Sequence, residues 1–176
     1  LYLIFFFDNK IYSTDDIDLS KLNGSIISEI PFLAEETSIS SPNDRSIVSE
    51  AFRMLISNLR YVVGHSNDKK VILVTSSVKG EGKTLCAVNM ALAFASLEKK
   101  VLLMGCDLRN PQIHKYFGGD KNRSGIVNYL INEGENINNL ISKPFEQFQN
   151  IDVMLSGSLP SNPLNLLSNE KLGELI

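Results

Sequence analysis

The 176-residue chain is long enough to form one domain with a sizeable hydrophobic core. Apolar residues make up 43% of the chain and charged residues 21%, an ordinary composition for a globular protein. The 17 basic and 20 acidic side chains give a net charge of −3, which argues against non-specific binding of nucleic acid. Both cysteines, Cys86 and Cys106, lie in apolar segments and are expected to be buried thiols, not a disulfide or a metal site.

The first segment, residues 1–7, is entirely apolar and is followed by a polar stretch. A membrane-spanning helix needs about 20 apolar residues. The segment is therefore either the end of a spanning helix whose front is missing, or a short buried strand or helix. Residues 8–46 are mixed and polar, and the serine-rich stretch from Thr37 to Ser46 is expected to be a linker.

An amphipathic helix is predicted next. Apolar side chains recur at spacings of three or four, which places them on one face: Val48, Phe52, Leu55, Leu59 and Val62. Glu50, Arg53 and Arg60 lie off this stripe. The helix is expected to pack against the rest of the domain through its apolar face.

Residues 71–75 form a continuous apolar run, typical of a central strand in a parallel sheet that is covered on both faces. The alanine-rich segment from Thr84 to Leu97 favours a helix, and residues 101–104 predict a second buried strand. Strand, loop, helix and strand form a right-handed βαβ unit. The expected fold is α/β, a parallel sheet with helices on both faces.

Shorter elements are predicted after the second strand. Residues 126–131 and 137–141 are expected to be helices, and residues 153–155 a strand. Asn162 and Pro163 are typical of an N-cap followed by proline at the first helical position. The chain stops inside a helical pattern, so the domain is expected to be incomplete at its C-terminus.

The stretch from Ser77 to Thr84 matches the phosphate-loop pattern G-x-x-x-x-G-K-[ST], except that Ser77 stands for the first glycine. Gly80 and Gly82 allow successive N–H groups to turn toward phosphate oxygens. The following helix directs the positive end of its dipole at the same place. Lys83 adds a charge for the β- and γ-phosphates, and the Thr84 hydroxyl is a hard oxygen ligand for Mg²⁺. The pattern follows a predicted strand and opens a predicted helix, which favours a nucleotide site over a plain turn.

Asp107 follows the second predicted strand. Ligands of doubly wound sheets bind at the carboxyl ends of the strands. Asp107 is therefore expected either to face a Mg²⁺ ion held by Thr84 or to cap the turn before Asn110 and Pro111.

Four segments together resemble the bacterial tyrosine kinases of capsule and exopolysaccharide export systems, which are P-loop ATPases related to MinD and ParA. They are "SEAFRMLISNLRYV", "VTSSVKGEGKTLCAVNMALAFA", "VLLMGCDLRNPQIHKYF" and "GSLPSNPLNLLSNEKLGELI". The start, "FFFDNKIYSTDDID", is similar to the junction just inside the last membrane helix of such kinases. The resemblance implies three regions: residues 1–7 as the end of a membrane helix, 8–46 as a juxtamembrane linker, and 47–176 as the nucleotide-binding domain.

The resemblance also implies a function: an ATP-dependent, autophosphorylating protein-tyrosine kinase that regulates polysaccharide synthesis and export. It implies Lys83 and Asp107 as catalytic residues, and Thr84 and Asp107 at the metal. ATP would contact the loop residues Ser77, Val78, Lys79, Gly80, Glu81, Gly82, Lys83, Thr84 and Leu85. Glu50 and Arg53 would form a ring of neighbouring subunits, at the cytoplasmic face of the bacterial inner membrane, with a membrane polysaccharide co-polymerase part.

The chain departs from the family pattern in places. Gly105 stands where the family has an aspartate, so weak phosphoryl transfer with retained ATP binding is predicted. Ile56 replaces the last arginine of the ring helix, which puts the ring contact in doubt. The third acidic motif and the tyrosine cluster would lie beyond Ile176. The five tyrosines present are expected to be packing residues: Tyr2, Tyr12, Tyr61, Tyr116 and Tyr129.

Two alternatives stay open. One is an ATP-gated assembly module without kinase activity, which Gly105 and Ile56 favour. The other is a positioning or partition ATPase like MinD or ParA, against which Val78 argues because it stands where their signature lysine would fall.

Overall fold

The computed structural model describes residues 11–21, 24–32, 37–64, 69–120, 122–132 and 134–176. In chain order, its α-helices and strands are α2 (Ile47–Val63), α3 (Lys83–Ser96), β1 (Val101–Met104), α4 (Ile126–Ile131), α5 (Ile137–Leu140), β2 (Ile141–Ser142), β3 (Ile151–Met154), α6 (Pro163–Leu167) and α7 (Glu170–Leu175). Three 3₁₀ turns accompany them, η1 (Thr14–Asp16), η2 (Leu19–Lys21) and η3 (Ile113–Phe117).

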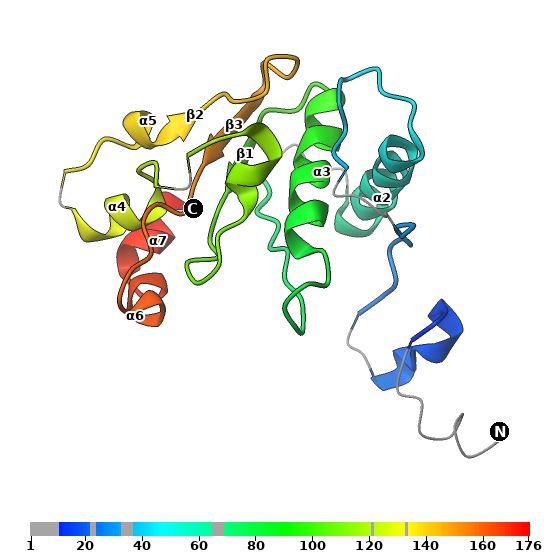
Figure 1. Cartoon of the computed structure of the whole chain (residues 1–176). Helices are drawn as coiled ribbons and strands as arrows, with labels where there is room; N and C mark the ends of the chain where they lie inside the picture. The colour runs from blue at the N-terminus through cyan, green and yellow to red at the C-terminus, as the bar shows by residue number, and fades with distance from the viewer. Residues whose placement is uncertain (1–10, 22–23, 33–36, 65–68, 121, 133) are drawn as a thin grey trace.

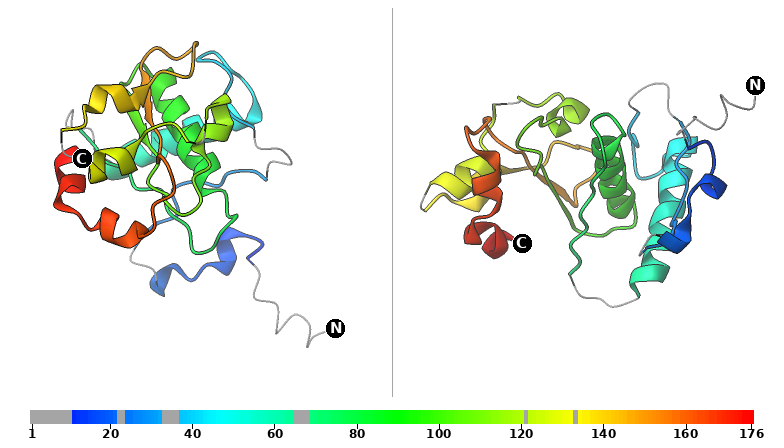
Figure 2. Two further views of the ribbon diagram at one scale, coloured as in Figure 1. Left: turned by 60° about the vertical axis from the view of Figure 1, so that its left-hand side comes forward. Right: turned by 90° about the horizontal axis from the view of Figure 1, so that it is seen from below.

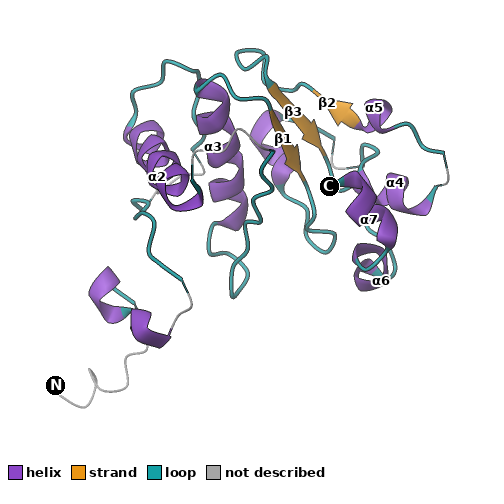
Figure 3. Cartoon of the chain, turned by 180° about the vertical axis from the view of Figure 1, so that it is seen from behind, coloured by secondary structure: helices purple, strands orange, loops and turns teal. Residues whose placement is uncertain are grey.

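The sheet has the strand order β1-β3-β2. β1 and β3 run parallel, with Val101 opposite Ile151 and Met104 opposite Met154, as the two adjacent arrows in Figure 3 show. β2 pairs antiparallel with β3. The expected parallel sheet is therefore mixed, because the short β2 joins it from the opposite direction.

Helices cover both faces of the sheet, as predicted. α3 packs on β1 and β3, and α2 packs on the outer side of α3. Figure 1 shows α4, α6 and α7 across the sheet from these two helices, and the view from below in Figure 2 gives the same layers. Each face has its own apolar cluster: Leu103, Ile151 and Val153 contact the α3 side, and Met154 joins Leu108 and Ile126 on the other.

Helix α2 confirms the predicted amphipathic helix. The Ser46 hydroxyl accepts a hydrogen bond from the Ser49 amide at its start, a standard N-cap. Val48 and Phe52 are buried, whereas Val62 at the last turn is 59% exposed, so the predicted stripe is buried only in its first part.

The prediction of a strand at residues 71–75 is wrong. This segment has no regular secondary structure, and Val71, Ile72 and Leu73 are 69%, 43% and 83% exposed. Within the described residues, β1 pairs only with β3, and no strand offers hydrogen bonds to residues 71–75. An apolar run becomes a strand only where a neighbour completes its backbone hydrogen bonds. The predicted βαβ unit consequently lacks its first strand.

The later elements follow the sequence closely. α3, β1, α4, α5 and β3 lie within one or two residues of their predicted ranges. Asn162 is the N-cap of α6, where its side chain accepts from the Asn165 amide, and Pro163 is the first helical residue. α7 contains the helical pattern with which the sequence ends.

The serine-rich segment predicted to be a linker packs onto the helical layer. Ile39 is 3% exposed, and its amide donates to the side chain of Asn89 on α3. The Ser49 hydroxyl on α2 donates to the Asp44 carbonyl.

The predictions for residues 1–7 lie outside the described residues. Among the helices that the structure describes, none is long and apolar enough to cross a membrane.

Candidate nucleotide-binding site

The predicted phosphate loop connects the irregular segment at residues 71–76 to helix α3. Gly80 and Gly82 have φ values of +93° and +87°, which non-glycine residues rarely adopt. A Cβ atom built on either glycine would meet nothing within 4 Å. The loop therefore has open space above its two glycines, which suits an incoming phosphate chain.

The loop is held partly by its own side chains. The Val78 amide donates to a carboxylate oxygen of Glu81 at 3.0 Å, and the Ser76 hydroxyl donates to the Val78 carbonyl at 3.0 Å. A carboxylate thus occupies one of the amides that a phosphate oxygen would use. An amide that binds this carboxylate is already oriented toward an anion.

Helix α3 begins directly at the loop, with Gly82 as its N-cap and no capping side chain. Its first amides are therefore left for another acceptor, and the helix dipole adds positive potential at this end. Lys83 and Thr84 occupy the first turn and are half-buried. The start of α3 thus places Lys83 and Thr84 directly after the loop.

Asp107, beyond the end of β1, lies next to this first turn. Its Oδ2 is 3.2 Å from Lys83 Nζ, and each of the two side chains is 32% exposed. Its Oδ1 accepts from the Asn110 amide at 2.9 Å and from the Arg109 amide at 3.2 Å. Asp107 therefore caps the following turn, as one of the two predicted roles required, and it also pairs with the loop lysine. Its predicted role at a Mg²⁺ ion stays a prediction.

The environment of Asp107 keeps it ionised. Partial burial alone would raise its pKa, but the Asn110 amide, the Lys83 ammonium and the Arg109 amide outweigh that effect, and the pKa is lowered.

Burial raises the pKa of the Cys86 and Cys106 thiols, and both cysteines are free. The sequence predicted buried thiols, whereas both side chains are half-buried.

Magnesium would find only part of its ligand shell in the described residues. They contain no group of three or more His, Cys, Asp or Glu side chains that could hold a metal ion. Mg²⁺ commonly takes one or two protein oxygens together with phosphate oxygens and water. The Thr84 hydroxyl, next to the paired Lys83, and the Asp107 carboxylate fit that limited protein contribution.

One residue at this edge was not predicted from the sequence. The Ser156 hydroxyl, just beyond β3, donates to the Gly105 carbonyl at 2.7 Å, and Ser156 is 4% exposed. A serine after an apolar strand is too common a pattern to signal such a role. Only the pairing of β1 with β3 brings Ser156 to the segment that carries Asp107.

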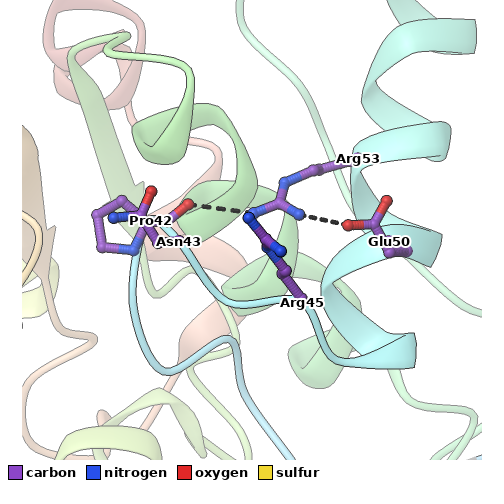
Figure 4. Close-up of a pocket in the computed structure, with 5 residues that line it drawn as sticks. All are labelled: Pro42, Asn43, Arg45, Glu50 and Arg53. Carbon is purple, nitrogen blue, oxygen red and sulfur yellow. Dashed lines mark hydrogen bonds and ion pairs between the residues drawn. The ribbon is translucent and has the colours of Figure 1, made fainter.

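The predicted ring residues of α2 face the segment before this helix and line a surface hollow with it. Figure 4 shows the side chains that line it, from Pro42, Asn43, Arg45, Glu50 and Arg53. Arg53 donates to Glu50 Oε1 at 2.6 Å and to the Pro42 carbonyl at 3.1 Å. The two ring residues are therefore paired within this subunit.

Ile56, in contrast, is fully buried against the core. Successive positions three apart on a helix turn by about 60°. Side chains at these positions therefore turn from the solvent at Glu50, through 28%-exposed Arg53, to the core at Ile56. An isoleucine suits this last place because it faces apolar neighbours.

The prediction that the tyrosines are packing residues holds only for two of them. Tyr116 and Tyr129 are half-buried and contact the apolar clusters. Tyr12 and Tyr61 are 73% and 84% exposed, contrary to the prediction. Tyr2 lies outside the described residues.

No family model matches the chain. Among curated proteins, it is 33% identical over 137 residues to tyrosine-protein kinase YwqD of Bacillus subtilis, an alignment that covers 78% of the chain and 56% of that protein. It is 32% identical over 138 residues to tyrosine-protein kinase wzc of Salmonella typhi, covering 78% of the chain and 18% of the relative. The chain thus spans about half of the first relative and a smaller part of the second.

Solved structures give the same picture. The chimeric protein CapA2B2 superposes with a TM-score of 0.73 at 29% identity, covering 89% of the chain and 66% of that structure. The kinase domain of the Escherichia coli tyrosine kinase ETK superposes with a TM-score of 0.67 at 27% identity, covering 87% and 56%. By sequence and by α/β fold, the chain belongs to the family of bacterial tyrosine-protein kinases.

Proposed function

We propose that this chain is the nucleotide-binding part of an ATP-dependent protein-tyrosine kinase. The observation that carries the proposal is the ion pair between Lys83 and Asp107, at 3.2 Å, beside a phosphate-loop pattern that opens α3. Lys83 comes from the first turn of α3 and Asp107 from the segment after β1, so the pair joins a helix to the end of a strand. The names of the relatives support a kinase.

Each residue has a distinct part in this proposal. The loop amides from Ser77 to Leu85 bind phosphate oxygens, and Lys83 neutralises charge on the β- and γ-phosphates. Thr84 and Asp107 would hold Mg²⁺, Thr84 through its hydroxyl and Asp107 through the water shell of the metal. ATP supplies the transferable phosphoryl group. Positioning and charge neutralisation are the main catalytic terms for such a transfer.

Nucleotide binding is tested first. Titration calorimetry with ATP and Mg²⁺ should give micromolar affinity for the chain, and Lys83→Met should weaken it by a factor on the order of 100. Lys100→Ala, which removes an equal charge from an exposed lysine after α3, is the matched control and should bind as the parent does. Absence of binding at millimolar ATP, or equal losses in the two variants, would sink the proposal.

Phosphoryl transfer is proposed to be weak because Gly105 carries no carboxylate. Loss of one preorganised group reduces turnover by a factor on the order of 10²–10³. Transfer of labelled phosphate from ATP to tyrosine, measured on the full-length protein, tests this. Turnover as fast as that of relatives with an aspartate at this position would contradict a weakened site.

A second candidate function, an ATP-gated assembly module without kinase activity, is favoured by Gly105 and by the burial of Ile56. It predicts nucleotide-dependent association with no labelled tyrosine. A positioning or partition ATPase is a weaker alternative. Hydrolysis of ATP without any phosphotyrosine would support it.

We also propose that neighbouring subunits assemble through Glu50 and Arg53, without the last arginine of the family's ring helix, which Ile56 replaces. Both side chains line an open hollow on the surface of α2, although they are paired with each other in the single subunit. A neighbouring subunit would have to exchange this internal pair for contacts of its own. Light scattering of the full-length protein and of Arg53→Ala would show whether oligomers depend on this helix.

The cellular setting is proposed from the resemblance to capsule and exopolysaccharide kinases. The kinase would act at the cytoplasmic face of the bacterial inner membrane, beside a membrane polysaccharide co-polymerase part, in control of polymer synthesis and export. Membrane fractionation of the full-length protein, with measurement of polymer output in a Lys83→Met strain, tests this setting.

A further inference from the structure

The segment that carries Asp107 is joined to β3 and the residues after it by one backbone and one side-chain hydrogen bond. The Gly105 amide donates to the Met154 carbonyl at 2.9 Å, which extends the β1–β3 ladder by one residue. Beyond that point, the Ser156 hydroxyl donates to the Gly105 carbonyl at 2.7 Å, with a longer contact of 3.4 Å to the Asp107 carbonyl. A hydroxyl has one hydrogen, so the bond to Gly105 is the principal one.

Ser156 is itself held in place. The Val127 amide donates to the Ser156 carbonyl at 3.0 Å, and the Ile126 amide donates to the Leu155 carbonyl at 2.8 Å. Both donors belong to the first turn of α4. Ser156 therefore connects the rigid β3–α4 layer to the chain that leaves β1.

Gly105 permits this close approach. A Cβ atom at position 105 would lie 2.9 Å from Ser156 Oγ and 3.0 Å from the Ser156 amide nitrogen. These distances are shorter than ordinary van der Waals contact, so a side chain would push the two segments apart. The missing side chain at Gly105 and the buried hydroxyl of Ser156 thus belong to one contact.

We propose that Ser156 is a positioning residue for Asp107: its hydroxyl bond to Gly105 fixes the place where the chain leaves β1 and so sets the carboxylate beside Lys83. Asp107 lies two residues after Gly105 along the chain, so holding the Gly105 carbonyl limits the positions that the carboxylate can reach. The Arg109 and Asn110 amides orient the carboxylate within its own turn, and the Ser156 bond fixes the place where that turn leaves the sheet.

Ser156→Ala removes the hydroxyl and little else. In the ligand-free protein, the amide resonances of Arg109 and Asn110 report on Asp107 because both amides donate to its Oδ1. We expect both resonances to shift in Ser156→Ala. Unchanged resonances would overturn the inference, whatever the protein does with nucleotides.

A matched control separates positioning from general loss of stability. Asn150, before β3 at the opposite end of the strand, donates to the Ala95 and Lys99 carbonyls at 2.9 and 2.6 Å. Asn150→Ala should lower the urea midpoint as Ser156→Ala does, yet leave the Arg109 and Asn110 resonances in place. Equal shifts in both variants would mean that Ser156 acts only on stability.

A second readout rests on the proposed function. Mg²⁺ should strengthen binding of a fluorescent ATP analogue to the parent chain, and Ser156→Ala should reduce this enhancement about three- to tenfold while affinity in EDTA stays within twofold. In an Asp107→Asn background, Ser156→Ala should change the enhancement by less than twofold. A full effect in that background would contradict action through Asp107.

The two readouts fail separately. If the parent chain binds no nucleotide, the proposed function fails, and the amide resonances still decide the role of Ser156. If Ser156→Ala does not fold, Ser156→Thr, which keeps the hydroxyl, takes its place and must retain the parent resonances of Arg109 and Asn110; shifted resonances there count against the inference.

Discussion

Lys83 Nζ and Asp107 Oδ2 lie 3.2 Å apart, across the gap between the start of α3 and the end of β1. Two half-buried charges thus neutralise each other at the position where the phosphates of a nucleotide would lie. Binding of a phosphate chain has to draw the lysine toward a new partner.

Asp107→Asn should separate the two effects of this carboxylate. Without Mg²⁺, the carboxylate competes with phosphate for Lys83, so its removal should tighten ATP binding in EDTA by about threefold. With Mg²⁺, the variant loses an oxygen near the metal, so the gain should disappear or reverse. Titration of a fluorescent ATP analogue in the two buffers measures both.

Glu146→Gln is the matched control for that prediction, because it makes the same change of net charge at an exposed site. If it alters affinity as Asp107→Asn does, only the overall charge of the protein matters.

Asn89→Ala should destabilise the fold strongly. This fully buried side chain accepts from the Ile39 amide at 2.9 Å and donates to the Thr37 and Leu85 carbonyls at 3.1 and 3.0 Å. Its removal takes the acceptor from the buried Ile39 amide, which lowers the free energy of unfolding by about 2–3 kcal/mol. Urea denaturation checks this. Asn58→Ala is the control: it breaks one exposed hydrogen bond to the Ile27 carbonyl and should change the free energy of unfolding by less than about 0.5 kcal/mol.

Asp44 predicts a pH dependence of stability. Its carboxylate accepts from the Ser40 and Ser46 amides at 2.9 and 2.7 Å, and these bonds lower its pKa to about 2. A folded-state pKa below the unfolded value stabilises the protein above pH 4, and the stabilisation is lost as the pH falls through 2. Asp44→Asn should therefore cost about 1 kcal/mol at pH 6, after allowance for solvent screening.

The difference between the parent and Asp44→Asn should shrink between pH 4 and pH 2. Urea denaturation at pH 6, 4 and 3 measures it. A difference that stays constant over this range would show that the amide bonds do not depend on the charge of Asp44.

Gly105→Ala and Gly105→Asp should both destabilise the protein, because a Cβ at this place meets Ser156 at 2.9 and 3.0 Å. The expected loss is about 1–3 kcal/mol, typical of added bulk in a close-packed contact. A carboxylate at position 105 is therefore not expected simply to restore the activity that the family pattern suggests. Urea denaturation should accompany every kinase assay of these variants.

Gly173→Ala provides the comparison. Its Cβ would meet nothing within 4 Å in α7, and alanine favours a helix over glycine by about 1 kcal/mol. Stability of Gly105→Ala equal to the parent would show that Ser156 yields without cost.

Local sequence patterns determined much of this protein. The apolar spacing of α2, the alanine-rich composition of α3 and the capping residues Asn162 and Pro163 act within one turn of chain, so each element could be predicted where it lies. The loop pattern and Asp107 were predicted as a site for the same reason, since their chemistry depends on spacing along the chain.

Contacts between distant segments were decided by the tertiary structure alone. The apolar run at residues 71–75 remained without a strand because no described neighbour pairs with it, although its composition is that of a buried strand. Ser156 gained its role only when β3 aligned with β1, and the serine-rich segment packed only because Asn89 lies beneath it. Hydrogen bonds across a sheet or between layers depend on register and approach, which local spacing does not encode.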